Sequence, residues 1–206
     1  MAHINLVPRA LARVGVGIAA AGAAALVGLA APAASASIVF SNVQITGSLS
    51  SGVTFITTPN DIDFTMTSTR VGDPSDPVRD GDLLITFVAT VTDGPALTMD
   101  HASILGALAG SGQIFFNEIV EDNVTGDRLG TYNAQITDNS QLPFGADIPF
   151  SPGTQIKVKK SFYLVALPTD GLDVAQVGFV EQRFVPTPGS LALLACGGML
   201  LRRRRR

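Results

Sequence analysis

The sequence predicts an all-β protein, an antiparallel β-sandwich of jelly-roll or immunoglobulin-like type, between two terminal segments of different composition. Three observations support this fold class. The middle of the chain holds about nine short apolar runs, turn-forming residues separate them every ~8 to 14 residues, and no helical pattern there exceeds about ten residues. Repeats of about 20 to 50 residues are not visible, which disfavours a propeller or a solenoid.

The N-terminal segment, residues 1–36, has the composition of a secretory signal peptide. Arg9 and Arg13 form its charged region, and a nearly unbroken run of Ala, Gly, Val and Leu follows over residues 14–31. Pro32 ends this run. Because arginines near an apolar segment stay in the cytoplasm, the rest of the chain is expected on the other side of the membrane.

Small side chains after Pro32 predict where signal peptidase acts. Ala34 and Ala36 stand at the two positions where that enzyme accepts small residues, so we place cleavage between Ala36 and Ser37, with the bond after Ala33 as the alternative. The competing interpretation is an uncleaved N-terminal anchor.

Four strands are predicted in the first half of the middle region, over residues 38–46, 53–57, 62–69 and 82–92. The last is the strongest, because its alternate residues are all apolar and share one face: Leu83, Ile85, Phe87, Ala89 and Val91. Residues 71–77 contain two prolines and a glycine, which cannot continue a strand ladder, and are predicted to be a loop.

Residues 99–109 fit two interpretations. Ile104, Leu105 and Leu108 have helical spacing, with Asp100 as a possible N-cap. The alternative is a strand that turns at Gly110-Ser111-Gly112 into a second strand over residues 113–120. We favour the strand, because a tight glycine turn between two apolar runs predicts a β-hairpin.

The second half continues with a polar turn over residues 121–127 and a strand over 128–137. Residues 138–153 contain three prolines and are predicted to be a long connection. Two further strands follow over 154–167 and 172–184. The first of these places the following side chains on one face: Ile156, Val158, Lys160, Phe162 and Leu164. The sandwich domain is therefore expected to span residues 37–184.

The charge of this domain excludes one class of partner. Residues 37–184 contain all 17 acidic residues of the chain but only seven of its 14 basic ones, a net charge of −10. A surface this acidic repels phosphate backbones, so nucleic-acid binding is not expected.

Cysteine chemistry does not stabilise the domain. Cys196, in the C-terminal segment, is the one cysteine of the chain, so residues 37–184 cannot form a disulfide. About 150 residues can bury an adequate apolar core without one.

Enzymatic chemistry has few candidate residues. His101 is the one histidine of residues 37–184, so any triad or zinc site would depend on it. Asp100 and Ser103 are near it, but adjacent strand residues point to opposite faces. A surface or edge histidine is the simpler interpretation, zinc is excluded, and the protein is predicted not to be an enzyme.

Acidic residues cluster at two places where calcium could bind, because carboxylates two apart in an extended loop can chelate that ion. These candidates are Asp80, Asp82, Glu121, Asp122 and Asp127. Acidic residues beside glycine also serve turns on conformational grounds. We therefore predict no cofactor, with calcium as the alternative.

Carboxylate pairs could also serve glycoside hydrolysis, where their separation in space decides the outcome. The domain has no tryptophan and two tyrosines, and so lacks the usual platforms on which sugars stack. Its 11 phenylalanines fall mostly within predicted strands and are expected to form the core. A glycosidase is therefore not expected.

The C-terminal segment, residues 185–206, has three parts. It begins with the motif Val185, Pro186, Thr187, Pro188 and Gly189, continues with an uncharged apolar stretch to Leu201, and ends with the arginines Arg202, Arg203, Arg204, Arg205 and Arg206. The 13 residues from Gly189 to Leu201 would form a helix of about 20 Å, shorter than the ~30 Å hydrocarbon core. Snorkelling arginines and bilayer thinning can compensate for this difference.

This segment resembles the PEP-CTERM sorting signal of bacterial exported proteins, although Thr187 stands where that motif usually has glutamate. The resemblance implies recognition by an exosortase-type enzyme, transient anchoring in the inner membrane, removal of the tail, and a final place at the cell surface or in the medium of bacteria that make exopolysaccharide. An ordinary C-terminal anchor with an arginine stop-transfer cluster is the alternative.

The sequence thus predicts a non-enzymatic exported protein of the cell surface or extracellular matrix. Its expected partners are signal peptidase, an exosortase-type enzyme and exopolysaccharide. The alternative function is a calcium-assisted adhesive or polysaccharide-binding module.

Overall fold

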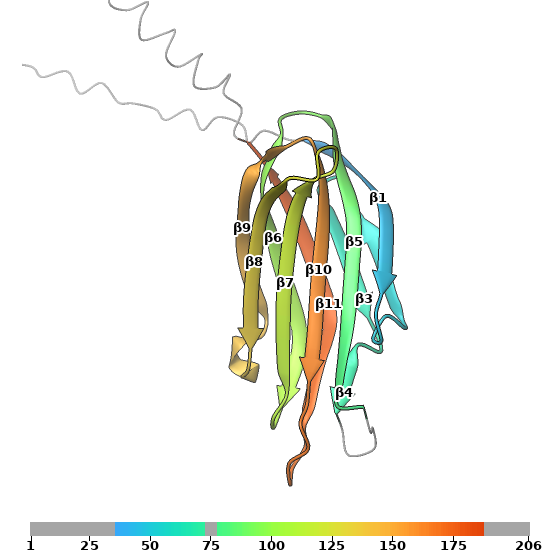
Figure 1. Ribbon diagram of the computed structural model, residues 1–206, viewed down its shortest axis with the longest axis vertical. Helices are drawn as coiled ribbons and strands as arrows, with labels where there is room; N and C mark the ends of the chain where they lie inside the picture. Colours follow the sequence, from blue (N-terminus) through green and yellow to red (C-terminus); the bar gives the residue numbers. More distant parts are fainter. Residues whose placement is uncertain (1–35, 73–77, 188–206) are drawn as a thin grey trace, which may run out of the picture. The chain divides into compact units, whose positions relative to one another are not determined.

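The computed structural model describes residues 36–72 and 78–187, which form eleven β-strands and one short 3₁₀ helix (Figure 1). The strands pair antiparallel in two sheets. The five-stranded sheet has the order β1 (Ser37–Thr46), β5 (Asp80–Asp93), β10 (Gln155–Val165), β7 (Gln113–Asp122) and β8 (Arg128–Ile136). The six-stranded sheet has the order β2 (Val53–Thr57), β3 (Asp61–Met66), β11 (Val174–Pro186), β6 (Leu97–Ala109) and β9 (Phe144–Gly153), with β4 (Arg70–Gly72) beside β11.

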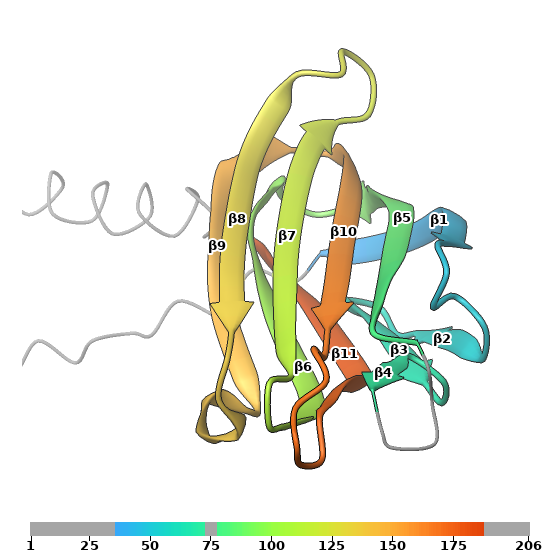
Figure 2. The same cartoon turned by 60° about the horizontal axis from the view of Figure 1, so that its bottom comes forward.

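The two sheets pack face to face, so the predicted all-β antiparallel sandwich is confirmed (Figure 2). Period-two alternation places apolar side chains of both sheets in the space between them. Phe87 of β5 lies at the centre of an aromatic cluster there. Its ring centroid is 6.1 Å from Phe40, 6.0 Å from Phe64 and 6.2 Å from Phe184. Aromatic packing between the sheets therefore contributes to the domain's stability.

The strand interpretation of residues 99–109 is confirmed by β6, but the predicted hairpin with the following strand is wrong. β6 pairs with β11 and β9, whereas β7 pairs with β10 and β8 in the other sheet. Gly110 adopts a φ of +57° between them. A tight glycine turn reverses the chain direction, but it does not determine whether the next strand stays in the same sheet.

Two segments predicted to lack strands contain them. The predicted connection 138–153 includes the 3₁₀ helix Asn139–Gln141 and the strand β9. β9 tolerates its prolines because it is an edge strand that pairs with β6 alone. The predicted loop 71–77 begins with the end of β4, which pairs with the first residues of β11.

The last strand also extends past the predicted boundary at residue 184. Val185 and Pro186 continue the pairing of β11 with β6, opposite Met99 and Leu97. The N–H and the hydroxyl of Thr187 then both donate to the carbonyl oxygen of Ala96, at 2.8 and 2.6 Å. The folded domain therefore includes the first three residues of the proposed sorting motif.

Candidate functional site

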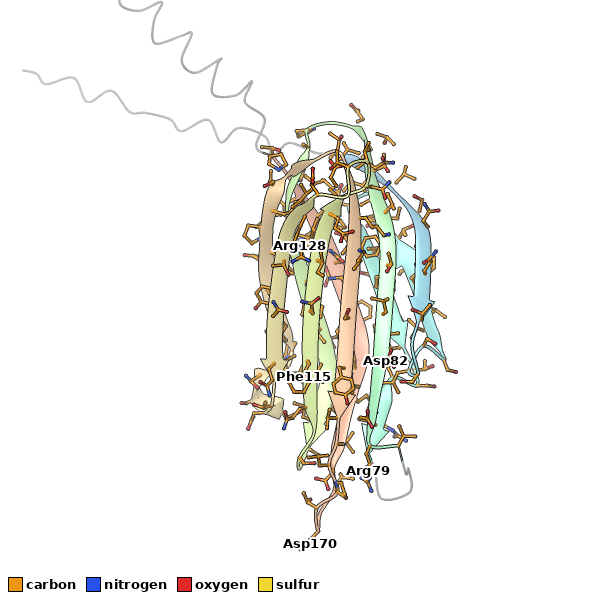
Figure 3. All side chains as sticks on the ribbon, in the orientation of Figure 1. Arg79, Asp82, Phe115, Arg128 and Asp170 are labelled. Atoms are coloured by element: carbon orange, nitrogen blue, oxygen red, sulfur yellow. The ribbon has the colours of Figure 1, made fainter. Side chains whose placement is uncertain are left out.

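The outer face of the five-stranded sheet carries an open hollow of about 600 Å³ over β5, β10, β7 and β8. This face is turned toward the reader in Figure 3, where Phe115 and Asp82 are labelled. The outward-pointing residues of its lining are Asp82, Leu84, Phe115, Asn117, Asn133, Gln135, Ser161 and Tyr163.

Strand register arranges these side chains in two rows that cross the sheet. One row runs through Asp82, Tyr163, Phe115 and Gln135. The next row runs through Leu84, Ser161, Asn117 and Asn133. Neighbouring strands lie about 4.8 Å apart, so each row of four residues is about 14 Å long. The hollow is thus long enough for an extended ligand that crosses the strands.

Two aromatic rings lie side by side at its centre. The centroids of Phe115 and Tyr163 are 6.2 Å apart at an interplanar angle of 40°, and the two residues are 37% and 44% exposed. The Tyr163 hydroxyl donates to Asp80 Oδ2 at 2.9 Å. This hydrogen bond is the main reason that the pKa of Tyr163 is raised above its ordinary value. The ring is therefore held at its outer end as well as at its backbone.

This platform differs from the expectation that the phenylalanines form the core and that a domain without tryptophan lacks surfaces on which sugars stack. Phe115 and Tyr163 are far apart in the chain and become neighbours only through the pairing of β7 with β10. The alternation of apolar and polar residues could have indicated it, because both residues occupy outward positions of their strands, where an aromatic ring is exposed to solvent.

Polar side chains border the rings and offer hydrogen bonds. The Asn117 amide donates to Asn133 Oδ1 at 2.5 Å, and the Gln135 amide donates to Gln113 Oε1 at 3.1 Å. Each amide has more donor and acceptor positions than these bonds use. The hollow can therefore bind a ligand that is apolar on one side and rich in hydroxyl groups at its edges.

Asp82 supplies a fixed negative charge at one end of the aromatic row. Ser48 donates to its Oδ1 from the hydroxyl at 2.8 Å and from the N–H at 3.2 Å. These bonds lower the pKa of Asp82, the side-chain bond being the largest cause, so the group is a carboxylate at neutral pH. It can accept a hydrogen bond from a ligand but is a poor proton donor.

The carboxylates predicted as calcium ligands have other partners. Asp80 and Asp82 bond to Tyr163 and Ser48, and Glu121 forms an ion pair with Lys159 at 2.8 Å.

The remaining two carboxylates stabilise the turn between β7 and β8. Asp122 accepts from the N–H groups of Thr125 and Val124 at 2.9 and 2.8 Å, which lowers its pKa, the bond from Thr125 being the largest cause. Asp127 accepts from the Thr125 hydroxyl at 2.9 Å. Within residues 36–72 and 78–187, no group of three or more histidine, cysteine or acidic side chains is arranged to hold a metal ion. Calcium binding at either place stays a prediction.

His101 lies on the outer face of the six-stranded sheet, while the neighbouring Asp100 is fully buried, as strand alternation predicts. Its Nδ1 is 2.8 Å from Asp147 Oδ1, and both side chains are exposed. His101 and the hollow therefore belong to different sheets and cannot form one site.

The proposed processing sites are described only in part. Ala36 is buried at the start of the domain, Ser37 begins β1, and Val185 to Thr187 end the last strand. Ala34, Pro188, Gly189 and Arg202 to Arg206 lie outside the described residues. In the part of the chain that is described, no helix is long and apolar enough to span a membrane.

Comparison with known proteins gives no family for this chain: no family model matches it, and no curated protein does. Among solved structures it is similar to TmCBM61 in complex with β-1,4-galactotriose, at 11% identity and a TM-score of 0.36, over 69% of this chain and 89% of that one.

Two further structures are similar at a comparable level. A family 11 carbohydrate-binding module of Clostridium thermocellum, in complex with a β-1,3-1,4-mixed-linked tetrasaccharide, has 12% identity, a TM-score of 0.28, and coverage of 75% and 90%. The α-L-arabinofuranosidase MgGH51 has 14% identity, a TM-score of 0.24, and coverage of 74% of this chain but 23% of the enzyme. Similarity at this level does not establish a function, which has to be argued from the residues of this chain.

Proposed function

We propose that this protein is an exported, non-catalytic polysaccharide-binding module, and that the outer face of its five-stranded sheet is the binding surface. The observation that carries the proposal is the exposed pair Phe115 and Tyr163 among amide, hydroxyl and carboxylate side chains in an open hollow. Sugar rings match this arrangement, because their C–H faces are apolar and their edges carry hydroxyl groups. Aromatic rings pack against the first and polar side chains bond to the second.

The charge of the site favours a neutral polysaccharide. Asp82 is a carboxylate in the hollow, Asp80 holds Tyr163 beside it, and residues 37–184 have a net charge of −10. An anionic polysaccharide would be repelled by this surface. The length of about 14 Å across four strands suits an oligosaccharide stretch rather than a single sugar.

The same residues argue against hydrolysis. Cleavage of a glycosidic bond needs one carboxyl group that is held protonated beside a second that is ionised. The pKa of Asp82 is lowered by Ser48, which is the direction opposite to that of a general acid. Binding is therefore proposed as the whole activity of the hollow: the rings orient the sugar, and the amides and Asp82 fix its hydroxyl groups.

Export and sorting belong to the same proposal and rest on the sequence. Residues 1–36 would direct secretion, and residues 185–206 would hold the protein at the inner membrane until an exosortase-type enzyme processes it. The polysaccharide-binding domain would then act at the cell surface or in the matrix, where exopolysaccharide is available. β11 runs directly into the motif, so the tail follows the domain without a linker.

Binding to immobilised neutral and anionic polysaccharides tests the proposal directly. The wild-type protein should be retarded by at least one neutral polysaccharide in affinity electrophoresis, and F115A/Y163A should lose this retardation. Each ring contributes about 0.5 to 1.5 kcal/mol beyond its buried area, so calorimetry should show at least about tenfold weaker binding for the double variant.

The matched control is F55A. Phe55 lies on β2 at the edge of the other sheet and is 44% exposed, as Tyr163 is. The F55A variant should therefore bind the polysaccharide as tightly as the wild type does. Equal binding by F115A/Y163A and the wild type would place the site elsewhere, and failure of the wild type to bind any of these polysaccharides would refute the proposal.

A further inference from the structure

A cluster of four polar side chains lies in the core, where apolar residues are expected. Lys160 of β10 and Glu118 of β7 point inward from the five-stranded sheet, and Asp100 of β6 and Gln182 of β11 point inward from the six-stranded sheet. All four residues are fully buried, with an exposed fraction of 0%. Ionisable residues are rarely buried completely unless they are paired, so the cluster requires an explanation.

The contacts place an amine directly against a carboxyl group. Lys160 and Glu118 are opposite each other in the pairing of β10 with β7, and Lys160 Nζ forms a hydrogen-bonded ion pair with Glu118 Oε2. The same Nζ lies 5.2 Å from the centre of the Phe116 ring. Strand pairing thus fixes both backbones, and the aromatic ring covers the amine.

A second carboxyl group is held against the first. The Gln182 amide donates to Asp100 Oδ2 at 2.5 Å and to Glu118 Oε1 at 3.1 Å. Burial, followed by the charge of Glu118, raises the pKa of Asp100 well above its ordinary value, so its surroundings favour the neutral, protonated acid. Among the described residues, Asp100 Oδ1 and Gln182 Oε1 have no hydrogen-bond partner.

We propose that Lys160 and Glu118 form an intramolecular amide bond between the Nζ of the lysine and the Cδ of the glutamate, with Asp100 as the proton carrier. The ion pair first becomes neutral, as the ammonium group of Lys160 gives one proton to the carboxylate of Glu118. The amine then attacks Cδ. Asp100 gives its proton to the departing hydroxyl group and takes one from the nitrogen, so that one water leaves and Asp100 ends as it began. No oxidant, reductant or cofactor is needed.

The core favours this condensation for two physical reasons. The two reacting groups are held in contact, and fixed neighbours of this kind react as if at effective concentrations of about 10⁵ M or more. The reaction also replaces a buried ion pair, whose desolvation is costly, by a neutral amide. The side chains of the cluster are fully buried, so bulk water that could reverse the reaction does not reach them. The bond would link two strands covalently in a domain whose residues 37–184 contain no cysteine.

Peptide mapping of the purified full chain tests the proposal. After denaturation and trypsin digestion, the wild-type protein should give a branched peptide that joins the segments of Lys160 and Glu118, with the summed mass of the two minus one water. The variant K160M should not give it, whereas K159M should. Lys159 is the matched control because it is the adjacent lysine and pairs with Glu121 on the outer face.

Two further variants test the roles of the acids. E118Q should give a branched peptide of identical mass, since ammonia leaves in place of water and the same amide remains. D100N should contain little or none of it, although both bonding residues are present. Separate, unlinked peptides from the folded wild-type protein would overturn the proposal. A branch that joins Lys160 to Asp100, or a complete bond in D100N, would overturn the roles assigned here to Glu118 and Asp100.

Discussion

Thr187 provides a direct test of how the domain ends. Its hydroxyl and its N–H both donate to the carbonyl oxygen of Ala96, at 2.6 and 2.8 Å. Replacement by valine removes the hydroxyl and keeps the shape of the side chain and the backbone bond. One intramolecular hydrogen bond contributes about 1 kcal/mol to stability, so T187V should lower the free energy of unfolding by about this amount.

Urea denaturation of a fragment covering residues 36–187 measures this loss. With a denaturant dependence of about 2 kcal/mol per molar urea, the midpoint should fall by about 0.5 M. T187S keeps the hydroxyl and is the control, so it should unfold close to the wild type. If T187V and T187S both unfold at the wild-type midpoint, residue 187 does not belong to the folded domain and the boundary predicted at residue 184 is the better one.

Three other predictions concern acid stability, metal binding and processing. D173N should be less stable than the wild type at pH 7 and should lose less stability between about pH 4 and pH 2. Hydrogen bonds, first that from the Ser111 N–H, lower the pKa of Asp173 to about 2 in the folded protein, so the carboxylate stabilises the fold above its unfolded pKa and this stability is lost as the pH falls through the folded pKa. Equal acid profiles of D173N and the wild type in thermal melts would contradict this. EDTA should shift the thermal midpoint only if the acidic turns bind calcium, and reductant should not shift it, because residues 37–184 lack cysteine. P186A/P188A should be exported but should stay at full length in the inner membrane of a host with the sorting enzyme, as cell fractionation and immunoblotting would show. A wild-type protein that keeps its tail and stays in the inner membrane of that host would leave an ordinary anchor as the better interpretation of the tail.

Local alternation was sufficient to predict most of the fold. The inward face of β10 follows from the sequence, including the unexpected place of Lys160 between Val158 and Phe162. The prolines of β9 misled the prediction, because a proline excludes a central strand but not an edge strand, and which strands lie at edges depends on the whole sheet. The turn at Gly110 misled it for a similar reason, since the sheet that β7 joins is fixed by β10 and β8.

The candidate site could not be predicted from neighbouring residues, because it is made by register. Phe115 and Tyr163, and likewise Glu118 and Lys160, are opposite each other only when β7 pairs with β10 as observed. A shift of one residue would move each side chain to the other face. The sequence offered the residue types and their faces, but the partner of each strand is a long-range property of the sandwich.

The same strand pair connects the two proposals physically. On β7 and β10, Glu118 and Lys160 are directly adjacent to Asn117 and Ser161 in sequence, so the proposed amide would lie on the inner face, one residue along each strand from that row of the hollow and three residues from the aromatic row. A covalent link there would hold β7 and β10 at a fixed distance. It would therefore keep the Phe115 ring of β7 and the Tyr163 ring of β10 at a fixed separation on the binding surface. Rigid surfaces lose less conformational entropy on binding, so K160M should bind the polysaccharide more weakly than K159M even though Lys160 is buried and cannot touch the ligand. Equal binding would show that strand pairing alone positions the rings.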